Sequence, residues 1–366
     1  RQAEDDGHLV EPVFYVPILP MILINGGEGI GTGYSTFVPC YNPESVADQL
    51  EALIKSDGAA DLPILHPWYQ GFKGKINRIN SSAFETLGKF EVLDSDRILI
   101  TELPVGIWTQ NYKEFLEGMV ADDPKKPKKK QILAEYRNDS DDFGIKIEVT
   151  FLPGELKKLI KQRKMVKTLR LSKRINLSNI HLYNDEGQII RYDNSEIILR
   201  DFYQTRKKYY EIRKEYYLRV LENERLLIYY KRKFIDYVIR KKIVIAKKSK
   251  PQVFERMEKL SFPRLSTKVD APEADKSYDY AANISMFSQT LEELDRLEKD
   301  YKAKLEEIKI YKSKTVEDLW LGELGEFRVA YEKILAKRKK DDLKMKKKKP
   351  KKIKKSRKRR VTRLLL

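Results

Sequence analysis

The chain has 366 residues, of which 41% are hydrophobic, so it is long enough for two or three folded domains and is not disordered throughout. Its single cysteine, Cys40, excludes a disulfide framework and a cysteine-rich zinc site, and three scattered histidines argue against histidine catalysis or a histidine metal cluster. No apolar run approaches the length of a membrane span and residues 1–6 do not resemble a signal peptide, so we expect an intracellular protein with no membrane partner.

The opening segment, residues 1–45, is unusually rich in glycine. An apolar run, Ile18–Ile24, ends at Asn25 and is followed by glycine at positions 26, 27, 29, 31 and 33. A P-loop needs lysine after its last glycine, where this chain has Thr32, and the spacing does not fit the dinucleotide fingerprint either. Two interpretations remain: a tight structural loop after a buried strand, or a backbone that comes very close to a ligand.

Residues 46–193 have the mixed texture of an α+β domain. A helix is predicted over Asn42–Ser56, because a capping residue precedes apolar residues at helical spacing. Runs of apolar and β-branched residues bounded by turn residues predict strands, and the last of them is a hairpin with its turn at residues 185–187. The predicted strands are Gly74–Ile79, Arg97–Leu103 and Phe143–Phe151, and the predicted hairpin is His181–Tyr192.

Residues 194–248 and 289–335 are predicted to form two long helices. Between Glu196 and Lys248 there is neither proline nor glycine, and apolar residues recur at heptad spacing, at 202, 209 and 216 and again at 220, 227 and 234. A continuous helix of these 53 residues would span roughly 80 Å, a length that needs a partner. The periodic run from Leu291 to Lys312 supplies an antiparallel partner, and residues 249–288 would form a small head between the helices. The tyrosines of the first helix are expected to pack in the seam rather than to stack on bases.

The net charge of +19 is concentrated at the C-terminal end. Residues 337–366 hold 18 Lys/Arg and two Asp, a net +16, which leaves +3 for residues 1–336. We expect residues 336–366 to be a disordered tail that serves as a nuclear-import signal, a DNA-binding arm or both, with a merely solubilising role as the alternative. A shorter basic run lies at Lys125–Lys130. The tail cations that we assign to these roles are Lys346, Lys347, Lys348, Lys349, Arg357, Lys358, Arg359 and Arg360.

Four stretches resemble eukaryotic-type DNA topoisomerase II, a type IIA enzyme. They are "EPVFYVPILPMILINGGEGIGTGYS" (Glu11–Ser35), "ITELPVGIWTQNYKE" (Ile100–Glu114), "LRDFYQTRKKYYEIRKEYYL" (Leu199–Leu218) and "TVEDLWLGELGEF" (Thr315–Phe327). Such matches recur in order from about Asp5 to Lys333, which is nearly the whole predicted fold. One position departs from the pattern, because Gly106 stands where relatives often have arginine.

The resemblance implies an α+β fold with a mixed α/β tower domain (46–193), followed by a long antiparallel coiled coil (194–248 and 289–335). A small helical head (249–288) would form the homodimer contact called the C-gate, and a disordered basic tail (336–366) would follow. It also implies that Ile30 is inserted between base pairs of a bound duplex to bend it, with glycines on both sides that let the backbone approach. The residues expected to contact DNA are Ile30, Gly29, Gly31, Thr32, Lys73, Trp108, Thr109 and Gln110.

The resemblance also indicates what the chain does not contain. None of the 21 tyrosines lies in the Arg-Tyr-Ile-Phe-Thr-like context of the family's nucleophile, and the Glu-Gly-Asp-Ser and Asp-x-Asp metal motifs are absent. We therefore expect no catalytic residue, metal or cofactor in this chain, while Mg²⁺ and ATP are implied for the full-length enzyme. The implied partners are double-stranded DNA, a second copy, and the ATPase and metal-binding/winged-helix parts of the same enzyme, in the nucleus. The alternative function is a non-enzymatic, DNA-binding coiled-coil protein that organises chromosomes.

Overall fold

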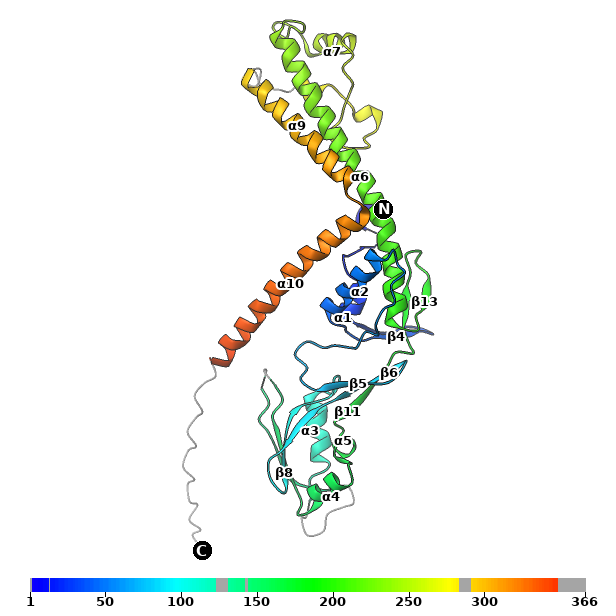
Figure 1. Cartoon of the computed structure of the whole chain (residues 1–366), viewed down its shortest axis with the longest axis vertical. Helices are drawn as coiled ribbons and strands as arrows, with labels where there is room; N and C mark the ends of the chain where they lie inside the picture. Colours follow the sequence, from blue (N-terminus) through cyan, green and yellow to red (C-terminus); the bar gives the residue numbers. More distant parts are fainter. Residues whose placement is uncertain (1, 13, 123–130, 142–143, 283–290, 348–366) are drawn as a thin grey trace.

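Four parts follow one another along an elongated molecule (Figure 1). The computed structural model describes residues 2–12, 14–122, 131–141, 144–282 and 291–347. We call the parts the proximal lobe, the distal lobe, the helix pair and the head, and define each below. The basic run Lys125–Lys130 and residues 348–366 of the predicted tail lie outside the described residues.

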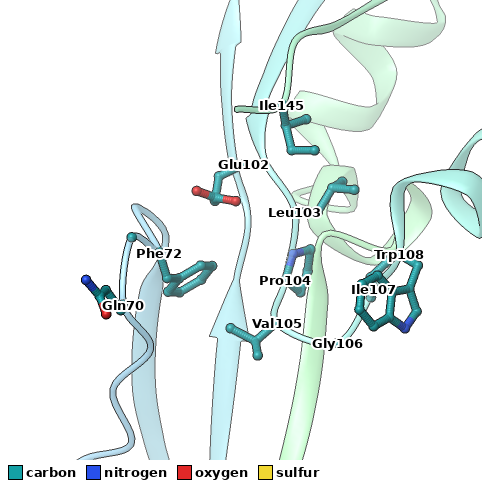
Figure 2. A pocket seen from close by; sticks show the side chains of 11 residues that line it. Gln70, Phe72, Glu102, Leu103, Pro104, Val105, Gly106, Ile107, Trp108 and Ile145 are labelled. Carbon is teal, nitrogen blue, oxygen red and sulfur yellow. The ribbon is translucent and has the colours of Figure 1, made fainter. Parts of the chain in front are cut away.

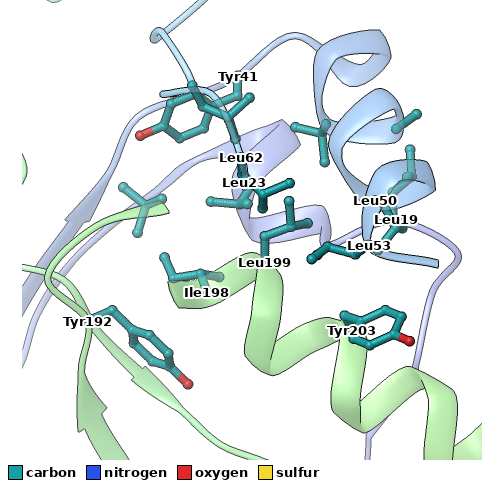
Figure 3. Close-up of a cluster of buried hydrophobic side chains, with 14 of the residues drawn as sticks. Leu19, Leu23, Tyr41, Leu50, Leu53, Leu62, Tyr192, Ile198, Leu199 and Tyr203 are labelled. Carbon is teal, nitrogen blue, oxygen red and sulfur yellow. The ribbon is translucent and has the colours of Figure 1, made fainter. Parts of the chain in front are cut away.

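The proximal lobe is built around α2 (Pro43–Lys55), whose N-terminus is capped as predicted: the Asn42 side chain accepts a hydrogen bond from the Glu44 N–H at 2.8 Å. One face of α2 packs against α1 and the first turns of α6. Leu50 and Leu53 of α2 and Leu199 of α6 belong to the buried cluster between these helices (Figure 3). The other elements of this lobe are β1 (Gln2–Asp5), β2 (His8–Pro12), α1 (Met21–Asn25), β3 (Gly27–Ile30), β4 (Ser35–Val38), β12 (His181–Tyr183) and β13 (Ile189–Arg191).

The distal lobe is an antiparallel sheet with helices against it. Its strand order is β7-β8-β10-β9, and the alternation of buried and half-buried residues along β10 (Ile147–Phe151) places Ile147, Val149 and Phe151 in the core. Tyr112 is buried there and donates a hydrogen bond to the Leu169 carbonyl at 2.7 Å. The remaining elements are β7 (Lys89–Val92), β8 (Arg97–Glu102), β9 (Leu133–Asn138), α3 (Thr109–Glu117), α4 (Glu155–Lys161) and α5 (Met165–Thr168).

A three-stranded sheet connects the two lobes. Its order is β11-β6-β5, formed by Ser172–Asn176, Ala83–Leu87 and Lys75–Asn80. Phe84 and Ile175, which are paired across β6 and β11, belong to the proximal core, whereas Leu171, just before β11, belongs to the distal core. This sheet therefore holds one lobe against the other.

The helix pair consists of α6 (Ser195–Ile239) and α9 (Leu291–Ser313), and it is antiparallel as predicted. Contacts across it pair rising numbers in α6 with falling numbers in α9: Tyr217 with Tyr311, Tyr229 with Tyr301, and Arg232 with Glu298. The predicted seam is wrong in its first half, because Tyr209 packs on Phe14 and Tyr216 is 49% exposed. The residues of α6 that form the seam lie one position later than predicted, at Tyr217, which contacts Tyr311 of α9, and at the buried Leu221.

The head packs against the far end of α6, where Phe234, Met257, Phe262 and Tyr280 share a buried cluster. Its described elements are α7 (Lys250–Lys259), η1 (Glu273–Asp275) and α8 (Asp279–Ala282). α6 is shorter than the predicted helix because it ends in a Schellman-type turn: Lys241 is left-handed (φ 57°) and the Lys242 N–H donates to the Tyr237 carbonyl. Residues 283–288 of the predicted head lie outside the described residues.

The last helix, α10 (Val316–Lys347), was not predicted as a separate element, because residues up to 335 were assigned to the returning helix and the rest to the tail. A capping box starts it, in which the Asp318 N–H donates to Thr315 Oγ1 and the Thr315 N–H donates to Asp318 Oδ2. Trp320 is buried and stacks on Tyr203, and Arg328 forms ion pairs with α2. The helix continues through residues 336–347, which the sequence assigned to a disordered tail, because Lys and Arg are good helix formers once a docked helix is under way.

Candidate nucleic-acid interface

The glycine-rich segment folds into a short antiparallel hairpin with Ile30 next to its tip. β3 and β4 pair Gly27 with Val38 and Ile30 with Ser35, and the Gly31 N–H donates to the Tyr34 carbonyl at 2.8 Å to close the turn. The apolar run before it is the single-turn helix α1 rather than the expected strand. Ile30 is 92% exposed, so it is not a packing residue under the loop.

The hairpin is held firmly by the chain around residues 179–181. The Phe37 N–H donates to the Asn179 carbonyl at 2.9 Å, the Asn179 side chain donates to Ser35 Oγ, and the His181 N–H donates to Thr36 Oγ1 at 3.1 Å. The imidazole of His181 also lies edge-on to Tyr34 at 5.6 Å. An isolated two-stranded hairpin is marginal in water, so these contacts fix the direction in which the exposed isoleucine points.

The glycines of the hairpin differ in whether the fold requires a residue without a side chain at that position. Gly26 has φ +66°, and a Cβ there would lie 2.7 Å from the Val38 carbonyl oxygen, so the fold itself requires glycine. A Cβ on Gly29 would lie 3.6 Å from Thr36 Cγ2, and one on Gly31 would lie 3.6 Å from the Tyr34 carbonyl, which are ordinary contacts. Nothing within the described chain therefore requires glycine on either side of Ile30.

Of the other predicted DNA contacts, Trp108 lines a pocket of about 370 Å³ (Figure 2), and Lys73 and Thr109 directly follow the lining residues Phe72 and Trp108 in the sequence. Trp108 lies at the N-terminus of α3 and is 76% exposed, so it is not a packing residue of the distal core. Lys73 is exposed, and its backbone N–H donates to the Glu102 carboxylate at 3.2 Å. Thr109 and Gln110 form the first turn of α3 rather than a turn of irregular chain, with Thr109 half-buried and Gln110 exposed.

Gly106 is the position at which the chain departs from the family pattern, and the Lys173 side chain occupies the space beside it. Gly106 has φ +77°, and a Cβ there would meet the Lys173 Nζ at 2.6 Å. Lys173 donates a hydrogen bond to the Gly106 carbonyl at 2.9 Å. A positive charge is thus present next to Gly106, delivered from β11 instead of from position 106.

The predicted residues form two groups on different lobes. Gly29, Ile30, Gly31 and Thr32 are exposed or half-buried in the hairpin of the proximal lobe, whereas Lys73 and the Trp108 turn belong to the distal lobe. The pocket that Trp108 lines contains none of the hairpin residues. Of the tail cations, Lys346 and Lys347 belong to the end of α10, and Lys348, Lys349 and Arg357–Arg360 lie outside the described residues.

One set of cations was missed. Residues 157–174 contain nine Lys/Arg and no Asp/Glu, and all nine are exposed. They lie on or between α4 and α5 of the distal lobe and at the start of β11 in the connecting sheet. The signal was present in the sequence as "KKLIKQRKMVKTLRLSKR", but the larger charge of the tail and acidic residues elsewhere hid it in the overall balance.

The described residues do not gather a metal-binding cluster: no three His, Cys, Asp or Glu side chains among them are placed to share an ion. The described residues therefore do not provide the ligands for the Mg²⁺ that the resemblance implies for the full-length enzyme. Likewise, no described helix is both long enough and apolar enough to cross a bilayer.

Comparison with known proteins places the chain in a family. The profile of the DNA gyrase/topoisomerase IV A subunit matches residues 2–325. The chain is similar to DNA topoisomerase 2 of Acanthamoeba polyphaga mimivirus (36% identity, covering 91% of this chain and 30% of the relative) and of Plasmodium falciparum (32%, covering 91% and 25%).

A solved structure agrees with the sequence relatives. The crystal structure of the Plasmodium falciparum topoisomerase II DNA-binding, cleavage and re-ligation domain superposes with a TM-score of 0.79 at 32% identity, covering 92% of this chain and 48% of that one. The chain spans about a third or less of the length of the two curated relatives. The chain belongs to the A-subunit family of DNA gyrase and topoisomerase IV, and it corresponds to a part of a type II topoisomerase.

Proposed function

We propose that this chain is the part of an ATP-dependent type IIA topoisomerase that binds and bends the duplex to be cleaved and holds two copies of the enzyme together. The observation that carries the proposal is Ile30, an aliphatic side chain 92% exposed next to the tip of an anchored hairpin. Exposing it to water has no benefit for the folded chain alone. It is explained if the side chain enters an apolar environment outside this chain.

The stacked bases of a duplex are such an environment. An apolar wedge unstacks one base step at a cost of a few kcal/mol, and the bent duplex can then touch more protein surface. Gly29 and Gly31 leave the flanks of the wedge without side chains, so the hairpin backbone can approach the groove. Rigid anchoring of the hairpin by Asn179 and His181 makes insertion productive, because the side chain does not fold back when it meets the bases.

Phosphate contacts would supply most of the affinity, and the exposed lysines Lys73, before β5, and Lys173, on β11 of the connecting sheet, are available for this. The exposed Trp108 lies on the distal lobe, beside the pocket. Mg²⁺ and ATP would act in other parts of the enzyme, and we assign no chemical step to residues of this chain. Its own contribution is to bind, to bend and to dimerise.

Dimerisation is assigned to the head at the end of the helix pair. A two-fold contact is the commonest assembly of a soluble homo-oligomer, and a head carried away from both lobes can meet its copy without disturbing the DNA surface (Figure 1). Sedimentation of the full chain should therefore show a dimer at tens of micromolar. Deletion of the head, residues 249–288, should yield a monomer, and a dimer that survives this deletion would contradict the assignment.

The non-enzymatic chromosome-organising function agrees with the basic composition but not with the family match over residues 2–325. The two functions differ in whether the bound duplex is bent. A ligase-mediated cyclisation assay on a duplex shorter than its persistence length tests this, because a bent duplex circularises faster. We expect the chain alone, without Mg²⁺-dependent cleavage, to increase the yield of small circles. Binding or bridging of duplexes with no increase would reject the proposal.

A further inference from the structure

We propose that an acidic, aromatic groove on the proximal lobe holds the basic tail of the same chain, here residues 348–366, when no DNA is bound. The groove has a volume of about 960 Å³ and lies between the chain that leads into α1, the β12–β13 hairpin and the first turns of α6. We call it the tail groove. The contact itself is independent of the proposed function, whereas its consequence, control of the access of DNA to the tail, rests on that function.

Aromatic side chains form much of the groove. Phe14 and Tyr209 lie edge-on with ring centroids 5.6 Å apart, while Tyr15 and Tyr183 are 73% and 72% exposed. A contiguous exposed apolar surface on a folded chain marks a binding site, and the faces of aromatic rings attract cations. The six aromatic residues of the lining are Phe14, Tyr15, Tyr183, Tyr192, Phe202 and Tyr209.

The groove carries only negative charge. Its lining includes Asp185, Glu186 and Asp201, and none of the described residues that line it is Lys, Arg or His. This is unexpected in a chain with 74 Lys/Arg against 55 Asp/Glu. The buried Tyr192 phenol donates a hydrogen bond to the Asp201 carboxylate and so fixes it at the groove. Three carboxylates would repel phosphates, so the groove is not a further DNA contact.

Lys208, just outside the groove, shows how an ammonium group binds at its edge. The Lys208 Nζ lies 3.5 Å from Asp185 Oδ2 and 5.9 Å from the centre of the Tyr209 ring. A carboxylate and a ring face thus act on one cation, and a lysine or arginine of the tail can make the same pair of contacts. Within the described parts of the chain, Glu186 and Asp201 form no ion pair, so they remain for cations of the tail.

The tail has the complementary composition. Residues 348–366 contain eleven Lys/Arg and no Asp/Glu, and their basic run is followed by Val361 and by leucine at positions 364–366. The cations suit the carboxylates and the ring faces. The apolar residues suit the floor of the groove, to which Leu182 and Ile198 also belong. A neutral apolar ligand would leave the three carboxylates without partners, so a basic segment fits the groove better.

The tail is also long enough to reach the groove. α10 leaves α6 at Trp320, which packs between Tyr203 and Tyr210, and runs about 40 Å from there to its end at Lys347 (Figure 1). The groove lies across α6 from this contact, and crossing a helix adds about 10 Å. Nineteen residues span up to about 60 Å when extended, and a run of like charges favours extension. The part of the tail from about Val361 onward would therefore occupy the groove.

A tail that is held in the groove is not available to phosphates. Duplex DNA has a far denser line of negative charge than three carboxylates, so DNA displaces the tail from the groove. The groove would thus lower the DNA affinity that the tail contributes. If the tail spends half of its time in the groove, the apparent Kd for DNA binding through the tail is about twice its intrinsic value.

The first test places a photo-cross-linking residue in the tail of the full chain. Val361 is replaced by p-benzoylphenylalanine, the protein is irradiated without DNA, and cross-linked peptides are identified by mass spectrometry. We expect cross-links to residues 14–17, to the β12–β13 hairpin or to the first turns of α6, in a band of monomer mass on a denaturing gel. Added duplex should abolish them. Cross-links to other parts of the chain, or only in a dimer band, would overturn the proposal.

Two variants with the same change of charge show whether the groove itself is needed. The groove variant combines D185N, E186Q and D201N, and the control variant combines E211Q, E215Q and D300N, which alter exposed acids outside the groove. Asparagine at position 201 can still accept from Tyr192, so the groove variant should melt like the wild type.

The cross-link yield of the groove variant should fall about fivefold, the effect of about 1 kcal/mol, and that of the control variant should match the wild type. Tyr15→Ser removes an exposed ring without a change of charge and should also lower the yield. Equal yields in the groove and control variants would overturn the proposal.

DNA affinity provides a second readout in the same variants. The groove variant should bind a duplex about twofold more tightly than the control variant, because its tail is released. The difference should vanish when residues 348–366 are deleted from both, a deletion that leaves every described element intact. A difference that persists would show that the acids repel DNA directly and would overturn the regulatory role. Absence of the cross-link leaves the cyclisation result and the proposed function standing. A cross-link without any bending by the wild type rejects the proposed function and keeps the tail groove.

Discussion

At the scale of single residues, the hairpin separates glycines required by the fold from glycines required by a ligand. Gly26 is left-handed and touches the Val38 backbone, whereas Gly29 has room for a methyl group. Sequence reasoning found the glycine cluster and the central Ile30 but could not make this distinction, because it depends on which strand pairs with which. The same holds for Trp108, whose exposure follows from its place before α3.

We predict opposite outcomes for two glycine-to-alanine changes. Gly26→Ala should destabilise the protein by about 1–2 kcal/mol or more, because a Cβ there is both left-handed and in contact with backbone. Gly29→Ala should change the free energy of unfolding by less than about 0.5 kcal/mol, because a Cβ there makes only an ordinary contact with Thr36. It should weaken DNA binding, since the proposed function needs the backbone beside Ile30 to come close to the duplex. Thermal melts and fluorescence anisotropy measure the two effects. Equal destabilisation by both changes would contradict the assignment of Gly29 to DNA.

At the scale of elements, the joint between the helix pair and the proximal lobe is the least predictable feature. α9 stops at Ser313, Lys214 donates to the Lys314 carbonyl at 2.5 Å, and α10 starts in a new direction. The Glu323 carboxylate accepts hydrogen bonds from Tyr210 at 2.6 Å and from Arg213 at 2.7 Å. Burial, reinforced by this carboxylate, raises the pKa of Tyr210 to about 12, so the phenol remains a donor throughout the neutral range.

Trp320 is the anchor of this joint. It is buried and lies between Tyr203 and Tyr210, with ring centroids 5.6 and 5.1 Å away. Trp320→Ala should therefore cost about 3–5 kcal/mol of unfolding free energy. Val329→Ala, at an exposed position on the same helix, is the matched control and should be close to neutral. Denaturant titration followed by circular dichroism checks both, and a neutral Trp320→Ala would show that α10 is not docked as described.

The elements that sequence predicted well are those with one dominant local signal. The capped helix α2, strands β5 and β8, the β12–β13 hairpin and helix α9 all lie within a few residues of their predicted bounds. The elements that were missed depend on tertiary contacts: α10 contains Gly322 and Gly325, which break a local helical pattern, and β6 and β11 are defined by pairing with each other. The end of α6 was missed because a lysine, not a glycine, takes the left-handed position.

At the scale of the whole molecule, charge is distributed between a folded surface and the tail. Deleting residues 348–366 should lower non-specific DNA affinity and reduce its salt slope, because this segment contains most of the basic run that ends at Arg360. The exposed cations of residues 157–174 should keep part of the slope after the deletion. In cells, we expect the same deletion to reduce nuclear accumulation of a fluorescent fusion. If the truncated protein shows the same salt dependence of DNA affinity as the full-length chain, all DNA contacts lie in the folded body. Nuclear import would then be the remaining function of the tail.

The bend made by Ile30 is the central claim, and one measurement tests it directly. A duplex labelled with a donor and an acceptor at its ends is saturated with wild-type chain, with Ile30→Ala, or with Met21→Ala, which shortens another exposed apolar side chain. Because Ile30 is not part of the core, Ile30→Ala should melt like the wild type. It should bind with similar affinity, since phosphate contacts dominate affinity, and yet give lower energy transfer in the bound state. Met21→Ala should bend like the wild type. If Ile30→Ala binds and bends as the wild type does, or if its melting temperature falls by many degrees, Ile30 is not the residue that bends the duplex.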